Sequence, residues 1–214
     1  MIEETEEYKK HKKNRIEKLK SVKKGENVFH LSYFDGIIDA DDLVEYDKII
    51  SEIGFEFSSY DQNGDMHNSL DSFILDTYFI LSQITITSII TNSINSATWD
   101  AIKFLVLKLW KRLRNQEITK YSSKTFKKKK IKFGIKVSLD ENTHFDFDLK
   151  GDLNDDLILQ SLDKMNDFIK NHKKNDKYKH PYFVEYDKRK GKWKSIDVEK
   201  EMCKIAQKSG SIKK

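Results

Sequence analysis

The sequence predicts an α+β protein. A mixed, largely helical N-terminal region is followed by a C-terminal ββαββ unit, in which one helix packs on an antiparallel sheet. Two observations support this class: helical periodicity in residues 97–114, and a second amphipathic helix flanked on both sides by pairs of alternating apolar segments. The chain has 214 residues, of which 37% are hydrophobic and 12% aromatic, enough to bury a core.

The charge and turn patterns divide the chain into four parts. Residues 1–24 form a charged arm, helical or partly disordered, because glutamates precede lysines at helical spacing. Residues 25–118 form a mixed α/β region with two short strands around "NVFHLSYFDGII" and "FEFSSYD", separated by a helix that Gly54 ends. Residues 126–200 form the ββαββ unit, and residues 201–214 form a basic tail.

Residues 73–94 are apolar and long enough to be considered as a membrane span. Between Thr77 and Asn95, however, ten of nineteen residues are Thr, Ser, Gln or Asn. These polar groups disfavour insertion, so the pattern favours a strand near 73–80 followed by a buried helix.

Residues 97–114 predict a basic amphipathic helix. Its apolar stripe consists of Trp99, Ile102, Val106, Leu109 and Leu113. We expect this stripe to pack against residues 73–94 in the core of the protein. The alternative is an interfacial helix on an anionic membrane, and the 73–113 region could also mediate oligomerisation.

The C-terminal unit begins with two strands, in which Ile131, Phe133, Ile135 and Val137 alternate, followed by Phe145, Phe147 and Leu149. A helix over about 153–170 follows Asp152. The strands "PYFVEYD" and "KWKSIDVE" close the unit through the turn "KRKG".

Charge is segregated along the chain. No Lys or Arg occurs from Ile49 to Ile102, whereas residues 103–136 hold thirteen basic residues and one acidic residue. Part of this pattern can be internal complementarity between blocks. Within the lysine run, Lys127 to Lys129 lie in a predicted loop before a strand and Lys130 points to solvent from the strand itself, so the run suits phosphate contacts. The predicted polyanion site is Arg112, Arg114, Lys124, Lys127, Lys128, Lys129, Lys130 and Lys132.

The chain contains no signature of nucleotide, zinc or serine hydrolase chemistry, so we predict no catalytic residues, no metal ligands and no cofactor. A weak exception is the acidic hairpin 140–150, where Asp146, Asp148 and Lys150 resemble in spacing the carboxylates and lysine of some metal-dependent nucleases. In a strand these residues lie on the face opposite Phe145 and Phe147, which predicts an ordinary solvent face.

These observations favour a small binding or accessory module, and they lean away from an enzyme. Its basic segment 103–136 would engage a polyanion such as nucleic acid, or an acidic protein partner. The first alternative is a membrane-surface effector of toxin or defence type, acting through residues 73–114; the membrane is the less favoured partner. The second is a metal-dependent nuclease using residues 140–150. The first residues carry no apolar leader, and the one cysteine, Cys203, forms no internal disulfide, so a cytoplasmic location is expected. The Lys-, Asn- and Ile-rich usage suggests a microbial source.

Overall fold

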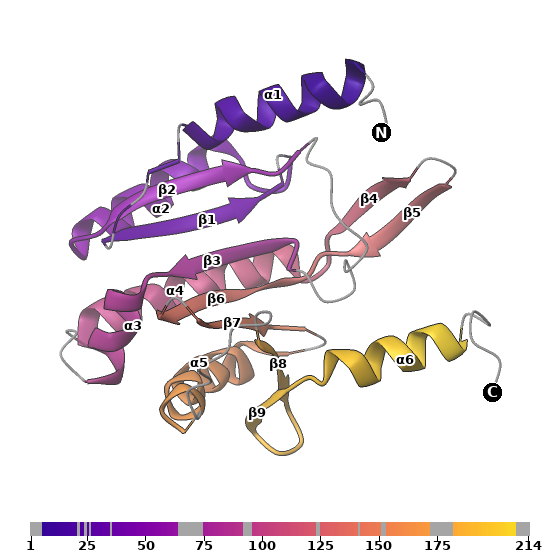
Figure 1. Ribbon diagram of the computed structural model, residues 1–214. Coiled ribbons are helices and arrows are strands. Elements are labelled where there is room, and N and C mark those ends of the chain that lie inside the picture. Colours follow the sequence, from indigo (N-terminus) through magenta and orange to yellow (C-terminus); the bar gives the residue numbers. More distant parts are fainter. Residues whose placement is uncertain are drawn as a thin grey trace.

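Both helices and strands build the protein, and seven of the strands form one mixed sheet (Figure 1). The computed structural model describes residues 6–20, 22–23, 25, 27–34, 36–63, 75–91, 96–122, 125–140, 142–150, 153–171 and 182–208. The sheet order is β2 (Glu56–Asp61), β1 (Val28–Tyr33), β3 (Thr77–Leu81), β6 (Phe133–Asp140), β7 (Thr143–Asp148), β8 (Tyr182–Asp187) and β9 (Lys192–Ser195). The predicted mixture of helices and strands is confirmed.

Strand directions follow from the connections. The pairs β1/β2, β3/β6 and β7/β8 are parallel, because each is joined through at least one helix that returns the chain to the same end of the sheet. The pairs β1/β3, β6/β7 and β8/β9 are antiparallel. The connecting helices are α2 (Ala40–Glu52), α3 (Gln83–Ile90) with α4 (Ser96–Leu113), and α5 (Asp155–Lys170).

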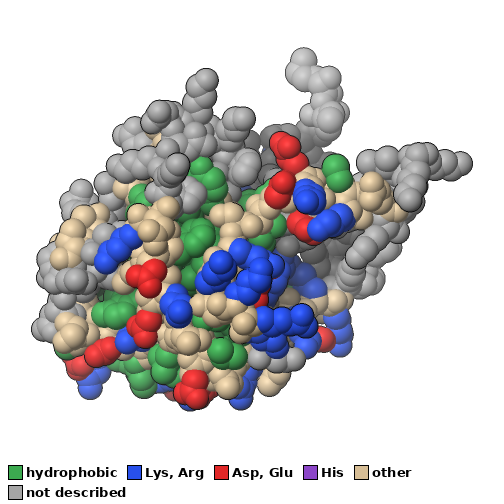
Figure 2. Space-filling view, turned by 90° about the horizontal axis from the view of Figure 1, so that it is seen from below, with side chains coloured by type: hydrophobic (Ala, Val, Ile, Leu, Met, Phe, Trp, Pro, Cys, Tyr) green, Lys and Arg blue, Asp and Glu red, His purple; other side chains and the backbone are tan. Residues whose placement is uncertain are grey.

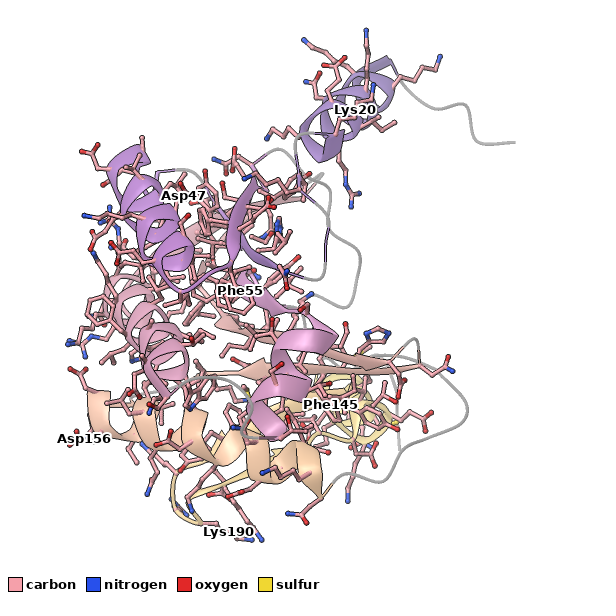
Figure 3. All side chains as sticks on the ribbon, turned by 90° about the vertical axis from the view of Figure 1, so that its left-hand side faces the viewer. Lys20, Asp47, Phe55, Phe145, Asp156 and Lys190 are labelled. Atoms are coloured by element: carbon pink, nitrogen blue, oxygen red, sulfur yellow. The ribbon has the colours of Figure 1, made fainter. Side chains whose placement is uncertain are left out.

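The core lies between the sheet and a helical layer in which α4 packs between α2 and α5. Figure 3 shows Asp47 of α2 and Asp156 of α5 on the same side of the sheet. Alternate residues of the strands face this layer, such as Phe79 in β3 and Phe147 in β7, and both are fully buried. Trp110 of α4 and Trp193 of β9 donate indole hydrogen bonds to the backbone oxygens of Leu153 and Ser161.

The α4 stripe occupies the middle of this layer. Ile102, Val106, Leu109 and Leu113 are buried, and Trp99 is half-buried against the same core. The predicted stripe of α4 therefore packs inside the protein, as expected from its spacing, whereas Phe104 on another side of the helix is exposed. Within the described part of the chain, none of the helices combines the length and the apolar character needed to cross a membrane.

The C-terminal elements occur in the order β6, β7, α5, β8 and β9, but their sheet is not antiparallel throughout. We predicted an antiparallel sheet, and the parallel β7/β8 pair corrects this, because a helix that connects neighbouring strands across one face makes them parallel. β6 also pairs with β3, so the strands of the C-terminal unit continue directly into those of the preceding region.

Two further elements differ from the sequence prediction. The lysine run is not a loop: β4 (Glu117–Ser122) and β5 (Thr125–Lys130) form an antiparallel hairpin that extends from the sheet at the right of Figure 1. The helix α6 (Val198–Lys208) begins before the predicted basic tail, where the Asp197 side chain accepts a hydrogen bond from the Lys200 amide, and continues into the tail. The N-terminal arm contains α1 (Glu6–Lys20), whose Lys18 pairs with Asp61 at the end of β2.

Candidate functional site

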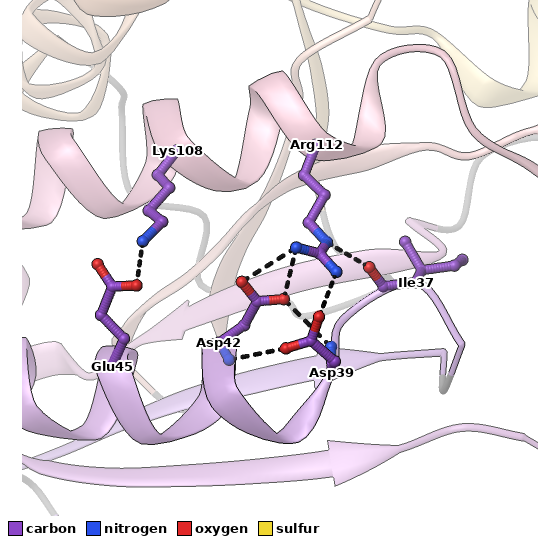
Figure 4. A network of polar contacts seen from close by, with 6 residues as sticks. All are labelled: Ile37, Asp39, Asp42, Glu45, Lys108 and Arg112. Atoms are coloured by element: carbon purple, nitrogen blue, oxygen red, sulfur yellow. Dashed lines mark hydrogen bonds and ion pairs between the residues drawn. The ribbon is translucent and has the colours of Figure 1, made fainter.

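Arg112, one of the predicted polyanion contacts, ties α4 to the start of α2 (Figure 4). Its guanidinium lies 2.7 Å from Asp39 and 2.8 Å from Asp42, and its Nε donates to the backbone oxygen of Ile37 at 2.6 Å. Asp39 and Asp42 also form the capping box of α2. The hydrogen bond from the Asp42 amide and those from Arg112 lower the pKa of Asp39. Arg112 therefore has a structural role at the junction of the two helices.

Other basic residues of α4 pair in the same way with the acidic neighbouring helices. Lys108 pairs with Glu45 of α2, Lys111 lies 2.7 Å from Asp155 of α5, and Lys103 lies 3.2 Å from Asp163 of α5. The basic residues of α4 thus pair with acidic residues of the two helices beside it, which accounts for part of the charge segregation in the sequence. These cations are engaged within the protein.

The lysines of β5 divide between the two faces of the strand. Lys129 lies 2.6 Å from the buried carboxylate of Asp76, just before β3, while the other Asp76 oxygen accepts from the backbone amide of Lys132 at 2.9 Å. Asp76 therefore fixes the base of the β4–β5 hairpin to the sheet. Lys132 is half-buried, and burial lowers the pKa of Lys132 despite the nearby carboxylates of Asp148 and Asp76.

Lys128 and Lys130 are exposed on β5, and Arg114 is exposed just after α4. Lys127 belongs to β5 and pairs in register with Lys120, and Lys124 lies outside the described residues. Of the predicted set, the structure thus separates Arg112, Lys129 and Lys132, which contact the protein itself, from Lys128, Lys130 and Arg114, which are directed to solvent.

A second basic group, absent from the predicted site, occupies the β8–β9 turn. Lys188, Arg189, Lys190 and Lys192 are all exposed, and no ion pair joins them to any residue that the structure describes. The turn is well defined, because the Asp187 carboxylate accepts hydrogen bonds from the amides of Arg189 and Lys190, and Gly191 has a positive φ of 58°. The signal was visible in the sequence as "KRKGKWK", which we interpreted only as a turn.

Figure 2 shows Lys and Arg side chains gathered on the face that is seen from below, and the β8–β9 turn lies at the bottom of Figure 1. Lys190 is labelled at the same lower end in Figure 3.

The sheet face opposite the helices carries a row of mostly polar residues. One residue from each strand contributes, in successive register: Tyr60, Ser32, Tyr78, Gly134, Asp148, Glu185 and Lys194. Gly134 is required in this row, because a Cβ atom there would lie 2.0 Å from the backbone oxygen of Phe147 and 2.8 Å from Leu75. Leu75 is buried, so it covers this position of the sheet.

Asp146 and Asp148 of the acidic hairpin are buried, with 5% and 7% of their surfaces exposed, which corrects the expectation of a solvent face. Alternation along a strand does not reveal whether other parts of the protein cover its polar face. Burial raises the pKa of Asp148 to about 6, against the attraction of Lys132 and Lys150. It also raises the pKa of Asp146, which Lys136 partly offsets at 3.6 Å.

Glu185, the register partner of Asp148 on β8, accepts from Lys150 and lies 2.7 Å from Lys194. Burial opposes its ionisation, but these two lysines lower the pKa of Glu185. A cleft of about 450 Å³ opens beside these residues, between β7, β8 and the start of α6. Its volume is in the range of sites for small molecules.

In the part of the chain that the structure describes, no three His, Cys, Asp or Glu residues are arranged to hold a metal ion. Comparisons of the chain with models of known protein families, with curated proteins and with solved structures found no match.

Proposed function

We propose that this protein is a polyanion-binding module that contacts the backbone of nucleic acids through the β8–β9 turn and the exposed lysines of β5. The observation that carries the proposal is the division of the basic residues. Those of α4 pair with α2 and α5, whereas Lys188, Arg189, Lys190 and Lys192 project into solvent from one turn. Four positive charges within five residues are sufficient for several phosphate contacts.

The geometry of the turn supports this role. Hydrogen bonds to Asp187 fix the backbone of the turn, so little backbone conformational entropy is lost when its side chains meet a ligand. Lysine ammonium groups contact phosphates as point charges, and Arg189 can donate two parallel hydrogen bonds to one phosphate. Such contacts position a protein on nucleic acid without reading its sequence.

The β5 strand offers a second, smaller contact. Residues two apart on a strand share a face and are separated by about 6.8 Å, so Lys128 and Lys130 match the axial distance spanned by about two phosphates of one duplex strand. Both residues are exposed. The hairpin would then extend the basic surface of the protein beyond its sheet.

The test is a titration of labelled single-stranded and double-stranded DNA of several sequences, followed by fluorescence anisotropy. The turn variant combines Lys188→Gln, Arg189→Gln, Lys190→Gln and Lys192→Gln. The strand variant combines Lys128→Gln and Lys130→Gln, and its matched control is Lys48→Gln with Lys170→Gln, two exposed lysines on α2 and α5.

We expect the turn variant to lose most of the affinity for every sequence, the strand variant to lose part of it, and the control to bind like the wild type. Binding that is equal in all four proteins would contradict the proposal. If the wild type does not bind DNA at low salt, the proposed contact with nucleic acid is wrong. Binding of an acidic protein by the wild type in that case would identify such a protein as the partner instead.

A further inference from the structure

A hollow of about 450 Å³ lies between α5 and β9, beside the basic β8–β9 turn. One wall comes from the C-terminal half of α5 with its cap residue, and the other comes from β9, an edge strand of the sheet. Figure 1 shows both elements in the lower part of the molecule, next to the turn. The volume lies within the range of about 300–1,000 Å³ that is typical of sites for small molecules.

The hollow has an aromatic wall. Phe168 of α5 is half-buried, and its ring makes edge-to-face contacts with Phe145 and Phe147, at centroid distances of 5.9 and 5.7 Å. Trp193 of β9 is held beside it by an indole hydrogen bond of 2.8 Å to the backbone oxygen of Ser161. The part of the Phe168 ring that lines the hollow is therefore a preformed surface on which a planar ring can stack.

Polar groups border the aromatic wall. Asp167, Asn171 and Ser195 are exposed and line the hollow. The Asn171 side chain donates a hydrogen bond of 2.8 Å to the backbone oxygen of Asp167, which orients its amide. A carboxylate, an amide and a hydroxyl together provide both donors and acceptors. The edges of nucleobases present the same two kinds of group, so the lining suits a base.

The hollow is continuous with the basic turn. Lys192 is one of the four exposed basic residues of the turn, and it also lines the hollow. Lys164 adds a second basic side chain to the lining, from α5. In a nucleic acid each base is joined to its phosphate through a single sugar. A strand whose phosphates contact the turn therefore carries its bases next to Phe168.

We infer, building on the proposed contact with nucleic acid, that the hollow takes up one unpaired base of a single strand, which stacks on Phe168. The base must be unpaired, because a base inside a duplex is stacked between its neighbours and leaves them only at a cost of a few kcal/mol. Stacking tolerates every base, since each has a π-face, so the site selects single strands and does not read their sequence.

Fluorescence anisotropy with the full chain at low salt tests the inference with two labelled DNA strands of equal length. One strand carries all its bases, and the other is abasic, so it keeps the phosphates and loses the stacking groups. Phe168→Leu removes the aromatic ring and keeps an apolar side chain. Phe104→Leu is the matched control, because Phe104 is 53% exposed on α4 and does not line the hollow.

We expect the wild type to bind the intact strand about fivefold or more tighter than the abasic strand. Phe168→Leu should lose most of this difference and bind the abasic strand like the wild type, whereas Phe104→Leu should keep it. Equal binding of the two strands by the wild type, or an unchanged difference in Phe168→Leu, would overturn the inference and leave the proposed backbone contact intact. Absence of binding to either strand would overturn both.

A readout on the wild type alone guards against misfolding of Phe168→Leu. The intact strand should shift the NMR signals of the Phe168 amide and of the Trp193 indole N–H, because both residues line the hollow. The abasic strand should shift the amide signals of the turn, residues 188–192, and leave those two signals in place. Equal shifts of the Phe168 and Trp193 signals with both strands would also overturn the inference.

Discussion

The ammonium group of Lys129 lies 2.6 Å from the buried carboxylate of Asp76, which comes 53 residues earlier in the chain. This pair shows that one member of the lysine run is part of the structure of the protein. Lys128 and Lys130, its neighbours on β5, are exposed. The strand β5 thus contains one lysine, Lys129, that stabilises the fold, and two lysines beside it that are available to bind a ligand.

Replacing Asp76 by Asn should destabilise the protein by about 1.5–3 kcal/mol. The substitution removes a charge-assisted bond to Lys129 and weakens the bond from the Lys132 amide. Urea unfolding measures the change. The exposed residue Asp47 provides the control, for Asp47→Asn should stay within about 0.5 kcal/mol of the wild type. Equal stability of the two variants would show that Asp76 does not hold the hairpin.

Arg112→Lys should cost about 1–2 kcal/mol in the free energy of unfolding. Lysine cannot reach Asp39, Asp42 and the Ile37 oxygen together, because it lacks the planar fork of guanidinium donors. Thermal unfolding monitored by circular dichroism detects the loss. Arg114→Lys, two residues further on and exposed, is the matched substitution and should be neutral. A neutral Arg112→Lys would mean that the network of Figure 4 contributes little.

Gly134→Ala should be among the most damaging single substitutions, at about 3 kcal/mol or more. The added methyl group would overlap the Phe147 backbone oxygen on the neighbouring strand, and neither β6 nor β7 can move freely inside the sheet. The measurement is again the free energy of unfolding. Gly36→Ala, at a turn position with open space around it, serves for comparison and should cost about 1 kcal/mol from its positive φ alone. The reverse ranking would contradict the close packing of β6 on β7.

The buried carboxyl group of Asp148 should make the stability depend on pH. The pKa of Asp148 is raised from 3.8 to about 6, so the native state binds more protons than the unfolded state between these values. The contribution of Asp148 to stability is therefore greatest below about pH 4 and is lost as the pH rises through about 6, by about 3 kcal/mol in total. Asp148→Asn should remove this dependence, so the variant gains relative to wild type as the pH rises.

Denaturant unfolding of both proteins at several pH values between about 4 and 8 checks this expectation. A difference between wild type and variant that stays constant over this range would show that Asp148 does not titrate in it.

Much of the helical layer follows from local sequence. The spacing of Ile102, Val106 and Leu109 predicts both the helix α4 and its buried face, and alternation predicts that Phe145 and Phe147 point into the core. Such patterns are readable because one face of each element is buried.

The β4–β5 hairpin could not be predicted in this way. Its lysine-rich strand lacks the alternating apolar residues that indicate a half-buried strand. Pairing with β4 and the ion pair to Asp76 define it, and both depend on residues distant in sequence. The parallel direction of β7 and β8 required the position of α5 over the sheet, which no local pattern reports.

The candidate site, too, could be predicted from the sequence only in part. The charges of the β8–β9 turn are present in the sequence, but their exposure, in contrast to the paired cations of α4, is known only from the structure. The burial of Asp146 and Asp148 was likewise hidden, because the burial of a polar strand face depends on residues outside that strand.

The salt dependence of DNA binding tests the central claim most directly. For wild type and the turn variant at Lys188, Arg189, Lys190 and Lys192, the logarithm of the association constant is plotted against the logarithm of salt concentration. On duplex DNA each phosphate that the protein neutralises contributes about 0.9 to the slope. The turn variant should therefore give a line shallower by about 0.9 for each phosphate that it no longer neutralises, with unchanged thermal stability. Parallel lines for the two proteins would contradict the account.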